Sequence, residues 1–269
     1  MAGVRGAIDV ASSEPAPQPA QAKWAMEAHK MPKELEQQDG GERCERGACP
    51  WRVGGWIELG ASHYRPRVAG MRVSAAPLPL TSLADDVAAL NRSLDRTEGL
   101  IVLAGHAYAG AVIALARPDR IRSLVYVTAL APDEGEKVAD VFYRLKPHPQ
   151  APKLAPNRDG LIWLPEEAFE RAFAQDASAD ERAVLAAVQR PISLSCITVP
   201  VGRPLWKDVP SWFLVAENDR MIAPETQRYM AARMKAKTET HAVDHAPIVT
   251  APSAVVGMIT DAIHSVAGN

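Results

Sequence analysis

Residues 100–110 constrain the fold of this chain more than any other stretch of the sequence. They begin with an uninterrupted apolar run, 100–104, of the kind that is buried on both faces of a parallel sheet. Gly105 and Gly110 then bound a short turn, and residues 109–116 continue as an apolar helical segment. A buried strand that turns tightly into a helix is half of a βαβ unit, so this stretch predicts a parallel sheet.

The sequence from residue 70 onward repeats this alternation of strands and helices. Apolar and alternating runs predict further strands at 70–77, 121–128, 210–216 and 237–243. Helical periodicity and capping residues predict helices at 81–96, 224–235 and 252–266. The predicted fold class is therefore α/β, with a mostly parallel sheet and helices on both of its faces.

Two segments depart from that alternation. Residues 132–208 lie between predicted strands and carry three helical patterns, at 136–145, 165–175 and 178–190, so we interpret them as a helical cap inserted after the strand near residue 128. Residues 1–50 are polar and partly proline-rich, and we expect a disordered or irregular arm. The remaining residues, 51–269, are expected to form one domain.

Composition excludes several classes of function. The net charge of −2, with lysines and arginines scattered, gives no basic stripe for nucleic acid. Cys44, Cys49 and Cys196 are too few for a disulfide framework or a zinc site, so we expect a reducing, cytoplasmic setting with neither metal nor cofactor. No apolar run approaches the roughly 18 residues of a membrane span. A homodimer is an assembly that the sequence leaves open.

The order of certain residues along the chain indicates chemistry. In acyl-transfer enzymes of this architecture, a nucleophile, an acid and a histidine follow successive strands at their carboxyl ends. Asp219 follows the predicted strand 210–216, and His245 follows the predicted strand 237–243. The turn after the strand 100–104 carries Ala107, whose side chain is a methyl group. The acid and the histidine are thus in place, and the attacking oxygen is missing.

Four segments, 105–113, 124–135, 212–219 and 244–247, resemble the α/β-hydrolase superfamily, close to its small-esterase and hydroxynitrile-lyase-like branch. The resemblance runs from about residue 70 to the end of the chain, and it implies the α/β-hydrolase fold. It places Ala107 at the nucleophile position of the elbow, which Gly105 and Gly110 bound. It makes Asp219 the acid, His245 the base, and the backbone N–H of Tyr108 one oxyanion donor.

The chain departs from the family pattern in two further places. Ala109 replaces the usual elbow glycine. The second oxyanion donor of the family comes from a His-Gly turn, and the nearest candidate here is 54–64. In the family an apolar strand precedes this turn, and here residues 47–53 stand in its place. We therefore expect the first part of the sheet to be shortened or differently built.

The elbow residue of this family has a positive φ, which costs an alanine roughly 1–2 kcal/mol. We expect Ala107 to keep that conformation, because Gly105 and Gly110 permit close packing of the strand and the helix.

Aromatic and histidine side chains of the elbow and the cap are candidates for lining an apolar pocket: His106, Tyr108, Tyr143, Trp163, Phe169, Phe173 and Trp206. The alternative is that they only pack the cap onto the sheet, and His106 in particular suits a position beneath the turn. Runner-up acids are Glu217 and Asp133, whereas Asp244 suits a turn.

These observations predict a small apolar or ester-like ligand and weak or no serine-hydrolase activity, since loss of the nucleophile costs on the order of 10⁶ in turnover. Two alternatives stay open. The chain is an active lyase or proton-transfer enzyme in which Asp219 and His245 act as a general base, or it is an engineered nucleophile variant of an active esterase.

Overall fold

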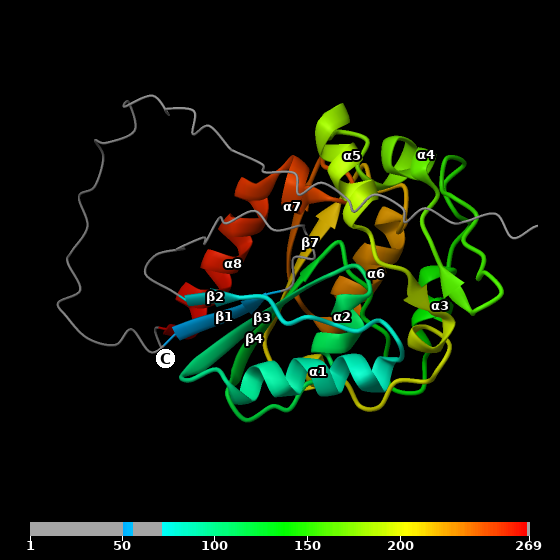
Figure 1. Ribbon diagram of the computed structural model, residues 1–269. Coiled ribbons are helices and arrows are strands. Elements are labelled where there is room, and N and C mark those ends of the chain that lie inside the picture. The colour runs from blue at the N-terminus through cyan, green and yellow to red at the C-terminus, as the bar shows by residue number, and fades with distance from the viewer. Residues whose placement is uncertain (1–50, 56–71, 268–269) are drawn as a thin grey trace, which may run out of the picture. The chain divides into compact units, whose positions relative to one another are not determined.

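A six-stranded parallel sheet forms the centre of the fold (Figure 1). The computed structural model describes residues 51–55 and 72–267, so the predicted arm, residues 1–50, lies outside the described residues. The strand order is β2-β1-β3-β4-β7-β8, and all neighbours are parallel. These strands are β1 (Trp51–Gly55), β2 (Arg72–Ser74), β3 (Leu100–His106), β4 (Ile121–Val127), β7 (Ser211–Ala216) and β8 (Lys237–His241). The predicted α/β class is confirmed.

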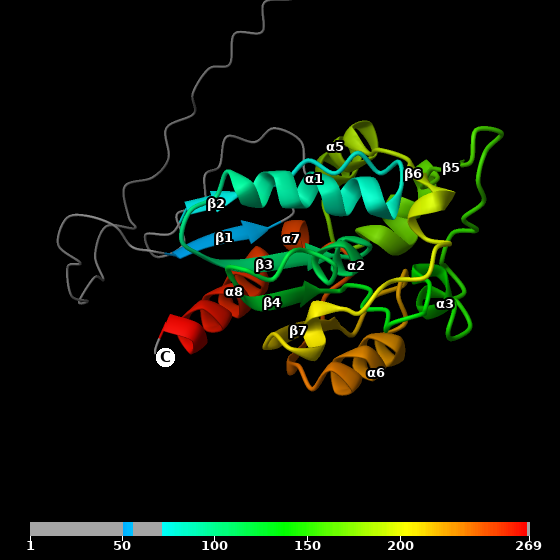
Figure 2. The ribbon, with the colours of Figure 1, turned by 90° about the horizontal axis from the view of Figure 1, so that it is seen from below.

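Each face of the sheet is covered by its own set of helices. One face packs against α1 (Leu83–Asp95), α2 (Ala109–Ile113) and α6 (Pro224–Met234), and Figure 2 looks toward this side, with α2 between the other two. The opposite face packs against α8 (Pro252–Ala267). Since side chains alternate along a strand, neighbouring residues of β3 face different helices: Leu103 packs on the α2 side and Val102 on the α8 side.

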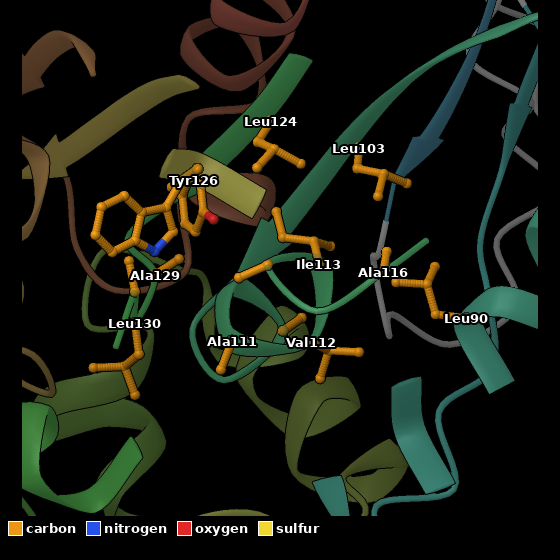
Figure 3. Packing of buried hydrophobic residues seen from close by; sticks show 14 of the residues in the cluster. Leu90, Leu103, Ala111, Val112, Ile113, Ala116, Leu124, Tyr126, Ala129 and Leu130 are labelled. Atoms are coloured by element: carbon orange, nitrogen blue, oxygen red, sulfur yellow. The ribbon is translucent and has the colours of Figure 1, made fainter. Parts of the chain in front are cut away.

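The core on the α2 side is built from large aliphatic and aromatic residues of the strands packed against small and aliphatic residues of α2. Figure 3 shows Ile113 of α2 beside Leu103 of β3 and Leu124 of β4, all of them fully buried. The first helix on this side, α1, begins where its cap predicts, because the Ser82 side chain accepts a hydrogen bond from the N–H of Asp85 at 3.1 Å.

The segment between β4 and β7 lies outside the large sheet, at the ends of the strands (Figure 1). Its elements are α3 (Val138–Phe142), β5 (Leu161–Ile162), α4 (Glu166–Ala168), the π-helix η1 (Phe169–Phe173), α5 (Ala179–Val188), β6 (Ile192–Ser193), and the 3₁₀ turns η2 (Leu194–Cys196) and η3 (Leu205–Lys207). The strands β5 and β6 form a separate antiparallel pair that the sequence pattern did not predict. The short helix α7 (Pro247–Thr250), after β8, was also not predicted.

Two expectations about the elements need correction. The expectation that residues 47–53 replace a strand is wrong, because β1 pairs with β2 on one side and β3 on the other. Its backbone groups are satisfied by two neighbours, so a strand forms there despite the weak apolar pattern. The helix predicted at 165–175 is also not one continuous α-helix: α4 passes into the π-helix η1 after only one turn.

Candidate active site

The turn between β3 and α2 holds Ala107 in a left-handed conformation, with φ 48°. The carbonyl of Ala107 accepts hydrogen bonds from the N–H of Leu130 at 2.9 Å and of Gly110 at 3.2 Å, which fixes the peptide plane after the turn. The conformation expected for Ala107 is therefore present. The surrounding structure holds a strained backbone at a residue that is not glycine.

Close contacts around the two glycines explain how this turn fits. A Cβ atom on Gly105 would lie 2.8 Å from the carbonyl oxygen of Ala109. One on Gly110 would lie 2.4 Å from the carbonyl oxygen of Leu130, closer than real Cβ atoms approach. Ala109, where the family has a further glycine, is buried and lines the cavity described below. The glycines that remain are thus at positions where a side chain would clash.

Asp219 and His245 meet at the carboxyl ends of β7 and β8, as the order of these residues in the sequence predicts. Oδ2 of Asp219 lies 2.8 Å from Nδ1 of His245, and both side chains are almost completely buried. When the imidazole is neutral, Nδ1–H donates to the carboxylate and Nε2 is free of a proton. This is the geometry of an oriented base.

The carboxylate of Asp219 is held by further donors. Oδ1 accepts the backbone N–H groups of Met221 at 2.7 Å and Ile222 at 2.8 Å, and Oδ2 accepts Nε2 of Gln227 at 2.8 Å. The acid is therefore fixed by its own loop and by α6. Gln227 is a site residue that the sequence reasoning missed, since no sequence signal distinguishes a buried glutamine on a helix such as α6 from a solvent-exposed one.

The runner-up acids are engaged elsewhere. Glu217 pairs with Arg228, and Asp133 pairs with Lys207 at 2.6 Å. Asp244 is buried and accepts the N–H of Ala246 at 3.1 Å, which is the bond expected of a turn residue.

His106 supports the loop of His245. Its Nε2–H donates to the carbonyl of His245 at 2.7 Å, and the Thr128 hydroxyl donates to the same oxygen at 3.1 Å. The two imidazole rings have centroids 4.8 Å apart. Burial, followed by the neighbouring His245, lowers the pKa of His106 to about 3, so this ring is neutral over the physiological range.

Backbone donors lie at the start of α2. The N–H groups of the first residues of a helix have no acceptor within the helix, and among the described residues Tyr108 and Ala109 are in this position, because Gly110 already donates to Ala107. They could face an oxygen that carries negative charge. The candidate second donor, residues 54–64, lies outside the described residues beyond Gly55.

A buried carboxylate anchors the Tyr108 side chain. Asp86 accepts the Tyr108 hydroxyl at 2.7 Å, the N–H of Leu80 at 2.7 Å, and the Cys196 thiol at 3.7 Å. Burial raises the pKa of Asp86 and of Tyr108, and it raises the pKa of the Cys196 thiol to about 12, which leaves that thiol unreactive. Sequence reasoning missed Asp86, although it shares a helix face with the buried Leu83 and Leu90.

A cavity of about 300 Å³ adjoins Ala107. Its polar side chains are already bonded: Gln189 bonds both backbone groups of Leu164, and Arg190 donates to the carbonyls of Leu78 and Pro79. The lining is otherwise mainly aliphatic and aromatic: Leu78, Leu80, His106, Ala107, Tyr108, Ala109, Leu154, Ile162, Leu164, Phe169, Phe173, Leu185, Val188, Ile192, Met221, Ala246, Ile248 and Val249.

Three side chains predicted to line the pocket lie elsewhere. Trp163 is 48% exposed, because side chains alternate on this extended segment and its neighbours Ile162 and Leu164 take the inward positions. Tyr143 is half exposed and packs edge-on against Phe142. Trp206 is buried, and its Nε1–H donates to the carbonyl of Pro132 at 3.3 Å. The other predicted pocket residues, His106, Tyr108, Phe169 and Phe173, line the cavity.

The described residues contain neither a metal cluster nor a membrane span. No three side chains among their histidines, cysteines, aspartates and glutamates are grouped as metal ligands. None of the helices in the described ranges has both the length and the apolarity needed to cross a membrane.

Comparison with known families agrees with this architecture. A model described as the alpha/beta hydrolase family matches residues 47–258, and the chain belongs to that family. No curated protein sequence matches the chain.

Solved structures with the same fold include several enzymes. Polyneuridine aldehyde esterase has a TM-score of 0.66 and 17% identity, over 78% of this chain and 97% of the esterase. A pyrethroid hydrolase from Sphingobium faniae JZ-2 has a TM-score of 0.64 and 20% identity, over 81% of this chain and 98% of the hydrolase. Tomato methylketone synthase I, solved with 2-tridecanone, has a TM-score of 0.60 and 15% identity, over 80% of this chain and 98% of the synthase. At these identities the likeness is one of fold.

Proposed function

We propose that this α/β-hydrolase-fold protein is related to carboxylic-ester hydrolases and binds a small, uncharged, apolar or ester-like molecule in the cavity beside Ala107, with weak or no serine-hydrolase activity. The observation that carries the proposal is the methyl group of Ala107 in a left-handed turn between β3 and α2. A serine there would be placed for attack, whereas a methyl group cannot be activated by His245.

The lining of the cavity supports the class of ligand. Its volume of about 300 Å³ is at the lower end of the range for small-molecule sites. The lining is apolar around Phe169 and Leu185, while Tyr108 and Ala109 offer N–H donors at one end. A carbonyl compound with an apolar chain suits both features. The esterase and the ketone-bound synthase with this fold agree with such a ligand.

The proposal is tested by hydrolysis of p-nitrophenyl butyrate. We expect wild type to remain near the uncatalysed rate and to be unaffected by His245→Ala. Ala107→Ser should raise the rate, and His245→Ala in that background should remove the gain, because the serine depends on the imidazole. Ala84→Ser, on the exposed side of α1, is the matched control. Wild-type hydrolysis that disappears with His245→Ala would contradict the proposal.

A second candidate is a general base without a nucleophile. The specific observation in its favour is that Asp219 and His245 remain paired at 2.8 Å, with three more donors on the carboxylate, although no serine is present for them to activate. The ring centroid of the His245 imidazole lies 4.8 Å from that of His106, two residues before Tyr108. A base in this position suits removal of a proton next to a carbonyl, since the N–H groups at the start of α2 would stabilise the resulting enolate oxygen.

This second candidate is tested by exchange of the α-protons of 2-tridecanone in D₂O, followed by NMR. Acceleration by wild type that is lost in His245→Ala and kept in His264→Ala, an exposed histidine of α8, would support it. An exchange rate equal to that of the buffer would exclude it for this class of ketone.

A further inference from the structure

The π-helix η1 brings an aromatic side chain onto the paired imidazoles. Phe173 lies edge-on to His245, with ring centroids 5.2 Å apart, and to His106, at 6.3 Å. It also lines the cavity together with Phe169, whose ring lies 5.4 Å from its own. A π-helical turn is rare and often lies at a functional site. Phe173 therefore lies between His245 and part of the cavity.

The residues around and after Phe173 are bonded to the loop that carries the acid. Nε2 of Gln175 donates to the carbonyl of Asn218 at 2.7 Å. Arg220 donates to the carbonyl of Arg171 at 2.8 Å. These two bonds lie on either side of Asp219 in the sequence, so the segment 169–176, here called the lid segment, is tied to the loop that orients His245.

A third bond joins the lid segment to the loop of His245 itself. Oδ2 of Asp244 accepts the backbone N–H of Asp176 at 3.0 Å. Its other oxygen, Oδ1, accepts the N–H of Ala246 and, at 2.7 Å, the hydroxyl of Thr250. Asp244 is completely buried. An asparagine could also accept the N–H of Ala246 in the turn. Accepting the N–H of Asp176 with the second side-chain atom as well requires both oxygens of a carboxylate.

We propose that Phe173 is a specificity-determining residue that keeps water and bulky molecules away from the imidazole of His245. Asp244 is the residue that positions Phe173, because it holds the lid segment. Each bond of the lid segment is short, but each joins it to a loop rather than to the sheet. Local opening of 169–176 can therefore expose His245 without unfolding the core. This inference concerns access to the imidazole, and it holds whether the site binds, abstracts protons or hydrolyses.

Carbethoxylation by diethyl pyrocarbonate, mapped by peptide mass spectrometry, measures the access of a reagent to each histidine. The exposed His148 and His264 serve as internal references. We expect the rate at His245, relative to these two, to rise in Phe173→Ala, and to rise about fivefold or more in Asp244→Asn, the factor that one net hydrogen bond supplies. Matched controls are Phe142→Ala, at the last residue of α3, whose ring contacts Tyr143, and Asp159→Asn on an exposed loop.

Amide hydrogen exchange separates positioning from general stability. In Asp244→Asn the N–H of Asp176 and its neighbours in the lid segment should exchange faster, while the amides of β3 and β4 remain protected. Equal acceleration in the central strands would mean that Asp244 supports the whole fold, and would contradict the positioning role. An unchanged relative rate at His245 in folded Phe173→Ala would contradict the role given to Phe173.

Discussion

Gly110 is the residue at which α2 comes closest to the loop that follows β4. A Cβ atom added at Gly110, 2.4 Å from the Leu130 carbonyl oxygen, would have no direction for relief, because the next nearest atom is the Cβ of Ala129 at 2.8 Å. The same peptide region holds the turn, since Leu130 also donates to Ala107. Backbone packing thus holds the left-handed conformation at residue 107, and this packing does not depend on a catalytic side chain there.

Gly110→Ala is accordingly expected to destabilise the protein by about 2 kcal/mol or more, because a methyl group would force the helix away from the loop. Urea unfolding measures this change. Gly257→Ala is the matched control: it lies in α8 with open space around the added methyl, and should stabilise by about 0.5–1 kcal/mol. Similar stabilities for Gly110→Ala and wild type would show that the helix can move without cost.

Residues of the site differ in how far the sequence reveals them. Ala107, Asp219 and His245 could be placed because each follows a strand, and the ends of parallel strands meet at one edge of the sheet. The partners of Asp86 could not, because Tyr108 and Cys196 come from distant parts of the chain, although the place of Asp86 on the buried face of α1 is a local signal. Local sequence patterns predict where helices and strands end, whereas contacts between residues far apart in the sequence can be identified only once the fold is known.

Between elements, Asp86 joins two residues of the cavity wall, Leu80 and Tyr108, to the 3₁₀ turn η2. It belongs to α1 and bonds the N–H of Leu80, the hydroxyl of Tyr108 at the start of α2, and the thiol of Cys196 in η2. Leu80 itself has a φ of 60°, so this bond holds a second left-handed residue beside the cavity. The arrangement depends on a buried carboxyl group, and its stability should therefore depend on pH.

The sign of that dependence follows from the raised pKa of Asp86. Burial lifts the pKa in the folded protein above the ordinary 3.8, so the folded state binds the proton more tightly than the unfolded chain. The contribution of Asp86 to the free energy of unfolding is largest below 3.8 and falls as the pH rises through the raised pKa. The stability of wild type minus that of Asp86→Asn should therefore decrease from about pH 3 to pH 8.

Asp85, the neighbouring residue on α1, is a control whose pKa is shifted in the opposite direction. Its hydrogen bonds with Ser82 and then Thr81 lower its pKa, so the stability that it contributes should rise with pH in the same comparison with Asp85→Asn. Parallel pH profiles for the two variants would rule out the proposed role of burial at Asp86.

Elements with a local signal were predicted well, and those without one were not. Ser82 begins α1, and the reciprocal bonds between Ser178 and Glu181 begin α5, as their capping residues predict. The strands β5 and β6 are two residues each, and pair across a gap of about thirty residues, so no periodicity announces them. The π-helix η1 looks like an ordinary helix in sequence.

For the whole molecule, the cavity under the segment between β4 and β7 has one charged lining side chain, Arg190, among the described residues. Arg190 donates to two backbone carbonyls, and the other lining residues are neutral. Because the guanidinium already donates to these carbonyls, an ionised headgroup would have to lose its hydration among mainly neutral side chains, which is unfavourable. We therefore expect the folded chain to bind a neutral molecule more tightly than an ionised molecule of equal length.

We expect 2-tridecanone to raise the thermal unfolding midpoint and tridecanoate to raise it far less at equal concentration and neutral pH. Saturation at 100 times the dissociation constant corresponds to about 2.7 kcal/mol of added stability. Differential scanning calorimetry measures the shift. Replacing Leu185 of the lining by Glu should abolish the effect of the ketone, whereas Val184→Glu, at an exposed neighbouring position, should leave it unchanged. Equal shifts from the ketone and the carboxylate would contradict the neutral ligand.

Because the turn at residue 107 is already left-handed, only the side chain separates this site from one with a serine at the elbow. Any alanine codon becomes a serine codon by one base substitution, whereas a new turn of this shape would need glycines, a register and a helix start to arise together. If the proposed function is right, a single base substitution at this codon would put a hydroxyl group on a turn that already has the left-handed conformation that serine-hydrolase chemistry requires.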